Sequence, residues 1–402
     1  MASKTGHLSS EAQGDLADLS IALIGGLAFA IAVLFLCSVP FSGNIAGSRD
    51  FISYWATGQQ LVHHANPYDR EAVARIEHDA GLAPRAVLLM RNPPWALPLA
   101  YFMGFLGLRM AAALWSLLLL ACLILSVLLV RRMHGNPRNH LHWLGLSFTP
   151  ALICLIMGQT SIFALLGVAI FLRWQDRRPF AAGAALWLCA LKPHLLLPFA
   201  AAVLFWIVAG RRYRVLAGAI SALAASLSAA WLIDPAAWTG YLAMMQAPAI
   251  ENEFVPCPAD AIRIWFWPQA TWLQFLPCAL ACAWALIYFG RHRQRWDWLR
   301  NGSPLLLVSV LFAPYCYLYD QCLVIPALLG GAYATRSRRL LLALATMILA
   351  LDVQLAFTKV ISPWFMWAAP AWLVWYILAR TAGGNAAVCS ELANVSSANS
   401  LR

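Results

Sequence analysis

An acidic residue in an aromatic setting, Asp50, lies shortly after the first long apolar segment, within Arg49-Asp50-Phe51-Ile52-Ser53-Tyr54-Trp55. On a helix, Asp50 and Tyr54 would share one face, because they are four residues apart. A carboxylate at the end of a membrane span lies where the dielectric constant falls, so its pKa tends to rise, which suits a general base. The alternative is that Asp50 only starts an interfacial helix whose Tyr and Trp form an aromatic belt. The other polar residues of the chain favour the general base.

The composition predicts that these residues belong to a polytopic membrane protein. The chain has 402 residues, of which 62% are hydrophobic and only 11% are charged. Apolar runs near ~20 residues, the length that spans a bilayer as a helix, recur along the whole chain. We therefore expect an all-α, polytopic membrane helical bundle that absorbs most of the chain as one domain.

The formal net charge of +11 is placed in a way that argues against nucleic acid as a partner. Basic residues cluster in short loops, at Arg131-Arg132, Arg177-Arg178, Arg211 to Arg214, Arg291 to Arg300 and Arg336 to Arg339. Under the positive-inside rule these loops face the cytoplasm, whereas most acids lie in the alternating loops. We therefore expect a multi-pass protein of the plasma (inner) membrane whose active site faces the periplasm or exterior.

The apolar pattern predicts roughly twelve transmembrane helices with both termini inside. The ends, 1–18 and 381–402, are expected to be disordered, and 19–380 to be the transmembrane domain. The first span, about 19–40, reads as an uncleaved anchor and precedes a large outer loop at 41–93. A re-entrant or tilted half-helix is expected at 94–107, and a second outer loop at about 234–268. The other spans are expected near 109–130, 142–157, 160–173, 180–192, 195–210, 214–233, 270–290, 303–318, 321–335, 339–357 and 364–380.

Polar residues at the outer ends of these spans are further functional candidates, because ionisable groups in membrane segments usually have a function. Gln159 could donate to a ligand oxygen, or it could only cap a tight helical hairpin. Lys192, two residues before His194, lies on the side where the positive-inside rule disfavours cations. It could hold a lipid phosphate, or its side chain could only extend to the interface.

Three more sets of residues belong to this outer side. Tyr319 and Asp320 end a span that follows Pro314. The tyrosine could belong to an interface belt, but the carboxylate needs a partner. Arg91 and Asn92, together with Arg49 beside Asp50, supply additional hydrogen-bond donors.

The sequence predicts neither a metal site nor a soluble nucleotide site. The ten cysteines show no paired spacing, and His63-His64 and His140/His142 have weak spacing for metal ligands. There is no Gly-rich phosphate loop, no HExxH, no Walker motif and no DxD motif of the type that holds a nucleotide sugar. We expect no cofactor and no metal, so a transferase of this kind would take its donor from the lipid phase.

The order of these motifs resembles a known family. The chain carries Asp50-Phe51-x-x-Tyr54-Trp55, Asn66-Pro67-Tyr68, Asn92-Pro93-Pro94, Gly158-Gln159-x-Ser161, Leu191-Lys192-Pro193-His194, Arg211-Arg212-x-Arg214 and Pro314-Tyr315 with Tyr319-Asp320. This ordered set, over about 20–380, is similar to glycosyltransferase family 87, which includes polyprenol-phosphate-mannose-dependent α-mannosyltransferases. Many members have Tyr-Pro-Pro in place of Asn92-Pro93-Pro94, and a His where this chain has Asp320.

The resemblance implies a GT-C membrane transferase that moves a hexose, such as mannose, from a polyprenyl-phosphate sugar to a lipid or cell-envelope glycan. Asp50 would deprotonate the acceptor hydroxyl, and the lipid phosphate would leave. The donor and substrate would be bound by a set of polar residues: Arg49, Tyr54, Arg91, Asn92, Gln159, Lys192, His194, Tyr319 and Asp320. The expected partners are the donor lipid, the acceptor and membrane lipids.

Two other function classes are compatible with a membrane bundle. A lipid or solute transporter usually has repeat symmetry and charged residues or broken helices near the middle of the bilayer. Here the ionisable residues gather toward the outer side, which disfavours that class. A catalytically inactive scaffold of the cell envelope is the third hypothesis, and it would tolerate the loss of Asp50.

Overall fold

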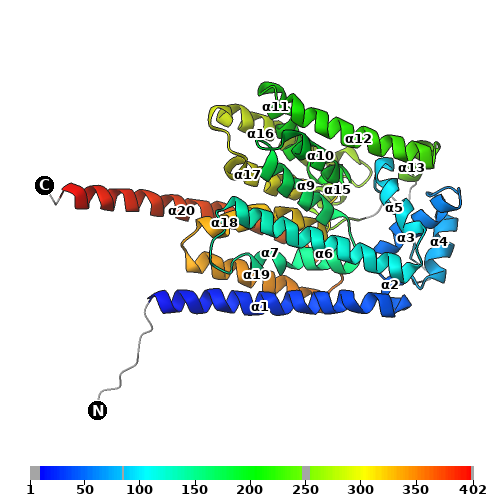
Figure 1. The fold of residues 1–402 in the computed structure, drawn as a ribbon, viewed down its shortest axis with the longest axis horizontal. Helices are drawn as coiled ribbons and strands as arrows, with labels where there is room; N and C mark the ends of the chain where they lie inside the picture. The colour runs from blue at the N-terminus through cyan, green and yellow to red at the C-terminus, as the bar shows by residue number, and fades with distance from the viewer. Residues whose placement is uncertain (1–9, 84–85, 247–253, 400–402) are drawn as a thin grey trace, which may run out of the picture.

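The computed structural model describes residues 10–83, 86–246 and 254–399, and every regular element in these ranges is a helix. Long helices such as α1, α6 and α12 run along the length of the molecule, and short helices gather at one end (Figure 1). The predicted all-α architecture is confirmed for this part of the chain.

The N-terminal half of the chain supplies both long and short helices, with η marking 3₁₀ turns. They are α1 (Ser10–Ser38), η1 (Val39–Phe41), α2 (Gly43–Gly47), α3 (Phe51–Val62), α4 (Arg70–Asp79), η2 (Pro94–Ala96), α5 (Leu97–Gly104), α6 (Leu108–Met133), α7 (Trp143–Leu146), α8 (Thr149–Met157), α9 (Ser161–Trp174), α10 (Pro179–Ala190), η3 (Pro193–Leu195) and α11 (Leu197–Ala209).

The C-terminal half continues in the same way. Its elements are α12 (Tyr213–Ile233), α13 (Ala237–Met245), α15 (Pro258–Phe266), α16 (Trp272–His292), η4 (Arg293–Arg295), α17 (Trp298–Leu311), η5 (Leu318–Val324), α18 (Ile325–Ala334), α19 (Arg338–Phe357), η6 (Pro363–Phe365) and α20 (Ala368–Asn399).

Several of the described helices suit a membrane protein. The segments long and apolar enough to cross a bilayer are Leu19–Phe41, Leu108–Met133, Tyr213–Ile233, Trp272–Arg295 and Arg338–Phe357. Shorter apolar helices are Trp143–Met157, Ser161–Trp174, Pro179–Ala190 and Leu197–Ala209. These segments coincide with predicted spans, whereas the total of roughly twelve membrane crossings stays a prediction.

Prolines explain where the helices differ from the predicted spans. The expected span at 142–157 is divided into α7 and α8 at an extended Phe148, two residues before Pro150. The expected span at 303–318 ends earlier, at Leu311, ahead of Pro314. Proline removes a backbone donor and disfavours helix at the preceding residue, so both breaks follow from the backbone chemistry. The expected half-helix at 94–107 is the short pair η2 and α5.

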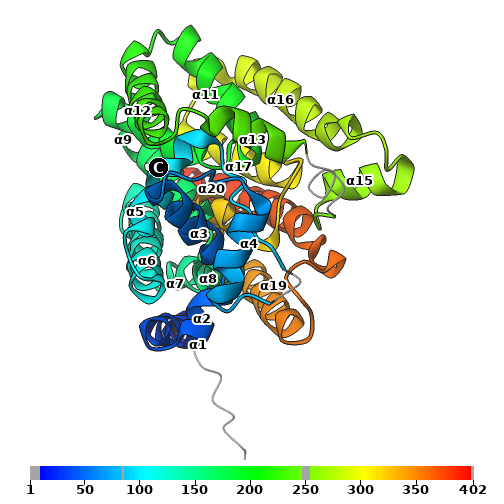
Figure 2. The same cartoon turned by 90° about the vertical axis from the view of Figure 1, so that its right-hand side faces the viewer.

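The short helix α3 is fixed against α5 at the end of the molecule that Figure 2 turns toward the viewer. Two glycines allow the backbones to touch. A Cβ added to Gly58 would lie 2.1 Å from the carbonyl oxygen of Ala100, and one added to Gly104 would lie 2.2 Å from that of Gly58. Small residues at such crossings let membrane helices approach closely. The contact sets the position of α3, whose N-terminal end follows Asp50.

The helices at both ends of the chain run past the predicted domain limits. Helix α1 begins at Ser10, inside the stretch 1–18 that the sequence analysis treats as disordered, and residues 1–9 lie outside the described part. Helix α20 continues to Asn399, through most of the expected tail at 381–402. The tail is rich in alanine, which favours a helix. The domain limits at 18 and 380 therefore stay predictions.

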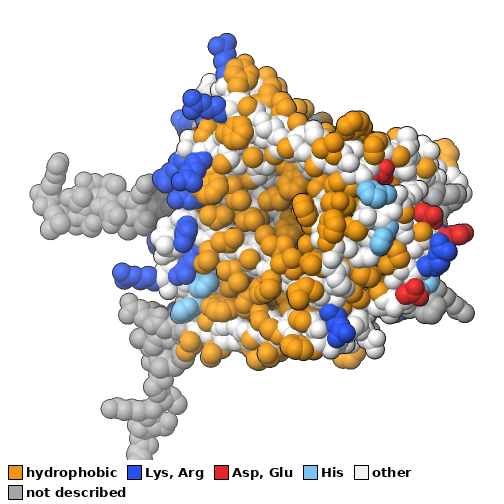
Figure 3. Space-filling view, turned by 45° about the vertical axis from the view of Figure 1, so that its right-hand side comes forward, with side chains coloured by type: hydrophobic (Ala, Val, Ile, Leu, Met, Phe, Trp, Pro, Cys, Tyr) orange, Lys and Arg blue, Asp and Glu red, His pale blue; other side chains and the backbone are white. Residues whose placement is uncertain are grey.

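Charge differs between the two ends of the molecule. Lys and Arg side chains gather at one end of the apolar body in Figure 3, and Asp and Glu side chains lie near the opposite end. The basic end includes Arg131 and Arg132 in the last turn of α6. The positive-inside rule predicts that this end faces the cytoplasm.

Cysteine labelling in intact cells tests this orientation. In a background without native thiols, Asn66→Cys is expected to react with a membrane-impermeant maleimide, because the loop after α3 lies at the acidic end. Asp176→Cys, in the basic loop after α9, is expected to react only after the cells are opened. Both side chains are exposed, so burial cannot protect either cysteine. The reverse labelling pattern would contradict the predicted topology.

Candidate active site

Four polar side chains from distant parts of the sequence form one hydrogen-bonded chain. The Gln159 amide donates to the Asp50 carboxylate with Nε2 2.8 Å from Oδ2. The Gln159 carbonyl oxygen accepts from Lys192, with Nζ 2.9 Å away. Lys192 in turn pairs with Asp320 at 2.8 Å between Nζ and Oδ1. The structure therefore brings together the predicted acid at the start of α3 and three polar residues from the outer ends of other helices.

Accessibility falls along this chain of residues. Asp50 and Gln159 are half-buried, whereas the side chain of Lys192 is 12% exposed and that of Asp320 only 2% exposed. A substrate can therefore approach Asp50 more readily than Asp320. This order matters chemically, because a proton acceptor must reach the group that it deprotonates.

Asp50 occupies the N-cap position of α3 without capping it. Its backbone is already helical, with φ −59° and ψ −20°, and its side chain accepts no hydrogen bond from the first turn. Burial raises the pKa of Asp50, while the hydrogen bond from Gln159 and the charge of Lys192 oppose the rise. Negative charge on Asp320 adds to the rise. A carboxylate with a raised pKa can accept a proton near neutral pH.

The turn at Gly158 places Gln159 beside Asp50. Gly158 ends α8 in the left-handed region with φ +78°, and a Cβ there would lie 2.8 Å from the Cβ of Phe51. Glycine is therefore needed both for the backbone conformation and for the approach of α3. The indole nitrogen of Trp115 on α6 donates to the Gly158 carbonyl at 2.7 Å, which fixes the turn from the other side.

Arg49 contacts the protein rather than the open side of the cluster. Its side chain is 2% exposed, and its guanidinium donates to the carbonyl oxygens of Leu155 and Ile156 and to the hydroxyl of Ser116. Burial lowers the pKa of Arg49 to about 10, so the group stays charged at neutral pH. The last carbonyls of a helix lack intrahelical partners, and Arg49 satisfies those of α8. We assign it to positioning Asp50.

Arg49→Met is expected to lower stability rather than to alter substrate affinity. The change keeps the apolar stem but leaves buried carbonyls and the Ser116 hydroxyl unpaired, at a cost of about 1–3 kcal/mol for each group that water cannot reach. The midpoint of thermal unfolding in detergent measures the loss. Arg91→Met, at an exposed arginine of the same region, is the matched control and should unfold like the wild type. Equal midpoints for both variants would contradict this role of Arg49.

Lys192 keeps hydrogen-bonding capacity for a substrate. Burial lowers the pKa of Lys192, but the Asp320 carboxylate outweighs burial, so the pKa is raised and the amine stays protonated. An ammonium group has three N–H donors, and Gln159 and Asp320 use two of them. The Tyr319 ring lies beside the amine, with its centroid 5.0 Å from Nζ. One donor is therefore left for an anionic or carbonyl-like oxygen.

Asp320 is the most enclosed member of the cluster. Its Oδ1 accepts from the Ser161 hydroxyl and from Lys192, and its Oδ2 accepts from the backbone N–H of Tyr317 at 3.0 Å. The last contact closes a capping box at the start of η5. With both oxygens used, Asp320 holds Lys192 in place and has no free oxygen for a substrate proton.

The remaining predicted residues surround this core. Asn92 donates to the Leu191 carbonyl at 2.8 Å, next to Lys192, and is buried. Tyr54 donates to the Gln159 carbonyl oxygen at 3.3 Å and stacks on Trp115 with 5.2 Å between ring centroids. Both residues therefore hold the polar chain from below rather than face its open side.

His194 and Arg91 lie toward Tyr315. The His194 ring meets the Tyr315 ring edge-on at 5.9 Å, and burial lowers the pKa of His194 to about 4, so the imidazole is neutral at pH 7. Burial raises the pKa of Tyr315, and the positive charge of Arg91 is among the groups that oppose this, which places Arg91 near the same ring. Arg91 is exposed and can meet a charged ligand at the edge of the cluster.

Sequence reasoning missed three contributors as site residues. Thr160 and Ser161 open α9 directly after Gln159, and their hydroxyls contact Asn92 and Asp320, respectively. Trp115 lies in the middle of an apolar run and gives no sequence signal of its own. For the two hydroxyls the signal was available, since a helix that starts at Gln159 necessarily carries them to the same place.

Comparison with known proteins identifies the family. The sequence model of glycosyltransferase family 87 matches residues 91–314. The chain belongs to glycosyltransferase family 87. No curated protein and no solved structure matches the chain. As a member of family 87 with apolar helices of membrane-spanning length, the protein is a membrane glycosyltransferase, which uses a sugar donor and an acceptor.

The family 87 match covers only part of the cluster. Asn92, Gln159, Lys192 and His194 lie inside residues 91–314, whereas Asp50 and Asp320 lie outside them. The link between the matched segment and Asp50 is therefore structural, through the hydrogen bond from Gln159.

Proposed function

We propose that this family 87 enzyme transfers a hexose from a polyprenyl-phosphate sugar to a hydroxyl of a lipid or cell-envelope glycan, with Asp50 as the general base. The observation that carries the proposal is the hydrogen bond between Gln159 and the half-buried Asp50. It joins a reachable carboxylate of raised pKa to a lysine that has a donor to spare.

The proposed reaction uses these groups in one displacement. Asp50 takes the proton of the acceptor hydroxyl, and the hydroxyl oxygen forms a bond to the anomeric carbon of the donor. The bond between that carbon and the phosphate oxygen breaks, so polyprenyl phosphate leaves with the electron pair. The phosphate dianion is a stable leaving group, so a base, a cation near the developing charge and correct positioning account for the catalysis.

Lys192 is the proposed cation for the leaving phosphate. Its remaining N–H can donate to a phosphate oxygen, and such a charge-assisted hydrogen bond is stronger than a neutral one. Arg91, exposed near Tyr315, can meet the same phosphate from the rim of the site. Asn92, Tyr54, His194 and Tyr319 are proposed to shape the donor site around these two cations.

A lipid-linked donor fits the placement of the cluster in the chain. The residues that carry it lie at the ends of apolar helices, at Gly158–Gln159 between α8 and α9 and at Lys192 after α10. A polyprenyl chain would lie in the bilayer beside such helices while its phosphate reaches their ends. With the basic end inside, the reaction would take place on the outer face of the membrane.

A transfer assay with purified protein tests the donor class. The protein in lipid nanodiscs is incubated with polyprenyl-phosphate mannose, glucose or galactose and with an extract of envelope lipids, and products are followed by mass spectrometry. One of the polyprenyl-phosphate sugars is expected to add one hexose to an acceptor. Transfer from GDP-mannose, UDP-glucose or UDP-galactose alone would contradict the proposal.

A further inference from the structure

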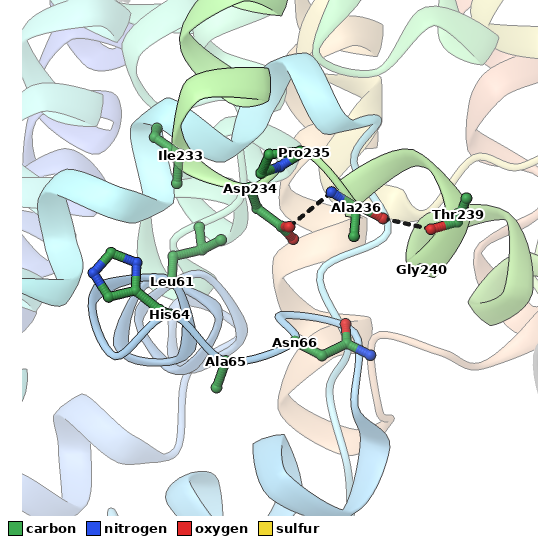
Figure 4. A pocket seen from close by; sticks show the side chains of 10 residues that line it. All are labelled: Leu61, His64, Ala65, Asn66, Ile233, Asp234, Pro235, Ala236, Thr239 and Gly240. Carbon is green, nitrogen blue, oxygen red and sulfur yellow. Dashed lines mark hydrogen bonds between the residues drawn. The ribbon is translucent and has the colours of Figure 1, made fainter.

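A separate cleft lies at the far end of α3 from the catalytic cluster. Figure 4 shows it between the end of α3 and the junction of α12 with α13. Its volume is about 410 Å³, within the range of small-molecule sites in proteins. Eleven positions of helix separate Asp50 from Leu61 on the cleft wall, so the two sites are roughly 16 Å apart along the axis at about 1.5 Å per residue.

Polar groups from both walls face this space with hydrogen-bonding capacity unused. Asp234 points between the two helices (Figure 4), and its Oδ1 accepts from the backbone N–H of Ala236 at 2.9 Å. Its second oxygen can accept from a ligand. On the opposite wall, the Oδ1 of Asn66 accepts from the backbone N–H of Tyr68 at 2.9 Å, so its amide N–H groups can donate. The exposed imidazole of His64 adds a further polar group.

An aromatic group borders the cleft below Gly240. A Cβ at Gly240 would lie 3.0 Å from the Tyr68 ring, so the glycine keeps the ring close to the space. Tyr68 is buried, and within the described residues its hydroxyl has no hydrogen-bond partner. Burial raises the pKa of Tyr68, and the charges of Tyr241 and Asp234 add to the rise, which places the phenol near the Asp234 carboxylate. Trp238 and Tyr241 continue the aromatic surface, with 6.3 Å between their ring centroids.

The charge of the lining restricts the ligand class. Among the described residues that line the cleft, Asp234 is the charged side chain, and neither Lys nor Arg is present. A phosphate or carboxylate ligand would be repelled by Asp234 and would find no cation to bind. A neutral molecule with several hydroxyl groups can donate to Asp234, accept from Asn66 and place its apolar face on Leu61 and Ile233.

We propose that this cleft binds a neutral saccharide unit of the acceptor, remote from the hydroxyl that receives the hexose. The proposal rests on the proposed transferase function for its biological meaning, but binding in the cleft is independent of catalysis. The separation of roughly 16 Å excludes the reacting sugar itself as the occupant. Contacts with remote parts of a substrate supply energy for orientation at the reacting centre, so the cleft would select acceptors that carry such a unit.

Saturation-transfer NMR measures this binding directly. The full-length protein is reconstituted in lipid nanodiscs free of glycoside detergents, and the probes are the methyl α-glycosides of mannose, glucose and galactose, with glucuronate as the anionic probe. We expect signal from at least one neutral glycoside and none from glucuronate. Ala236→Trp, at an exposed position of the cleft wall, should abolish the signal. Thr239→Trp, at a second exposed lining position, should do the same.

The matched control is His63→Trp, which adds the same bulk at an exposed residue outside the lining. It should keep the wild-type signal. Asp50→Asn should also keep it, even when transfer is lost, so failure of the cleft and failure of the transferase mechanism are told apart. No signal from any neutral glycoside, a stronger signal from glucuronate, or equal signals in Ala236→Trp and the wild type would each overturn the proposal.

Discussion

Asp50→Asn is expected to lower turnover by roughly 10²–10⁴-fold, the usual contribution of a general base. The substitution keeps the size of the side chain and still accepts the hydrogen bond from Gln159, but it cannot take the proton of the acceptor. Expression and the thermal midpoint should change little, because a neutral amide avoids the cost of burying a charge. Initial rates with saturating polyprenyl-phosphate sugar and acceptor measure the effect.

The pH profile separates a lost base from a misplaced one. Burial raises the pKa of Asp50 above its ordinary value of 3.8, so the wild-type rate should rise with pH through that raised value and then level off. The carboxylate is active only when deprotonated, which fixes the sign of the change. Asp50→Asn should lose this limb together with its rate, whereas a variant damaged only in positioning keeps it.

Asp320→Asn is the control for the assignment of the base, since Asp320 is the other carboxylate of the cluster. Both of its oxygens are hydrogen-bonded inside the protein, so its loss should impair the use of donor through Lys192 and leave the acid limb of the profile in place. Near-normal turnover in Asp50→Asn, combined with complete loss in Asp320→Asn, would move the base to Asp320.

The sequence predicted the members of the cluster better than their contacts. Asp50, Gln159, Lys192 and Asp320 were each recognisable as polar groups at the ends of apolar segments, where such groups are costly. Their order in space depends on the left-handed turn at Gly158 and on the approach of Phe51 to it, which no local pattern specifies. The pairing of Lys192 with Asp320, in particular, could not be read from positions 128 residues apart.

Arg49 shows the opposite case, in which position in the sequence suggested the wrong environment. Next to Asp50 it resembled a donor to a phosphate, but the helix geometry turns its side chain toward the last carbonyls of α8. The lengths of the spans were limited for a similar reason. Hydropathy locates apolar segments, whereas Pro150 and Pro314 decide where the backbone stops being helical.

Lys192→Met is expected to weaken the use of donor by roughly 10- to 100-fold in kcat/KM, the value of about 1.5–3 kcal/mol for a hydrogen bond to a charged group. Methionine keeps the apolar stem and removes only the ammonium group. The single variant has a second effect, however, because it leaves the buried Asp320 carboxylate without its counter-ion. Breaking such a pair costs about 3–5 kcal/mol of stability.

A double variant separates the two effects. Lys192→Met with Asp320→Asn has no unpaired charge, and Asp320→Asn alone keeps the ammonium group beside Gln159. Both should fold, as the thermal midpoint will show, and their ratio in kcat/KM for the polyprenyl-phosphate sugar isolates the contribution of Lys192 to the donor. We expect the double variant to be the weaker enzyme while its KM for the acceptor stays unchanged. If the two variants use the donor equally well, Lys192 serves only to neutralise Asp320, and the leaving phosphate must be held elsewhere, with Arg91 as the nearest exposed cation of the rim.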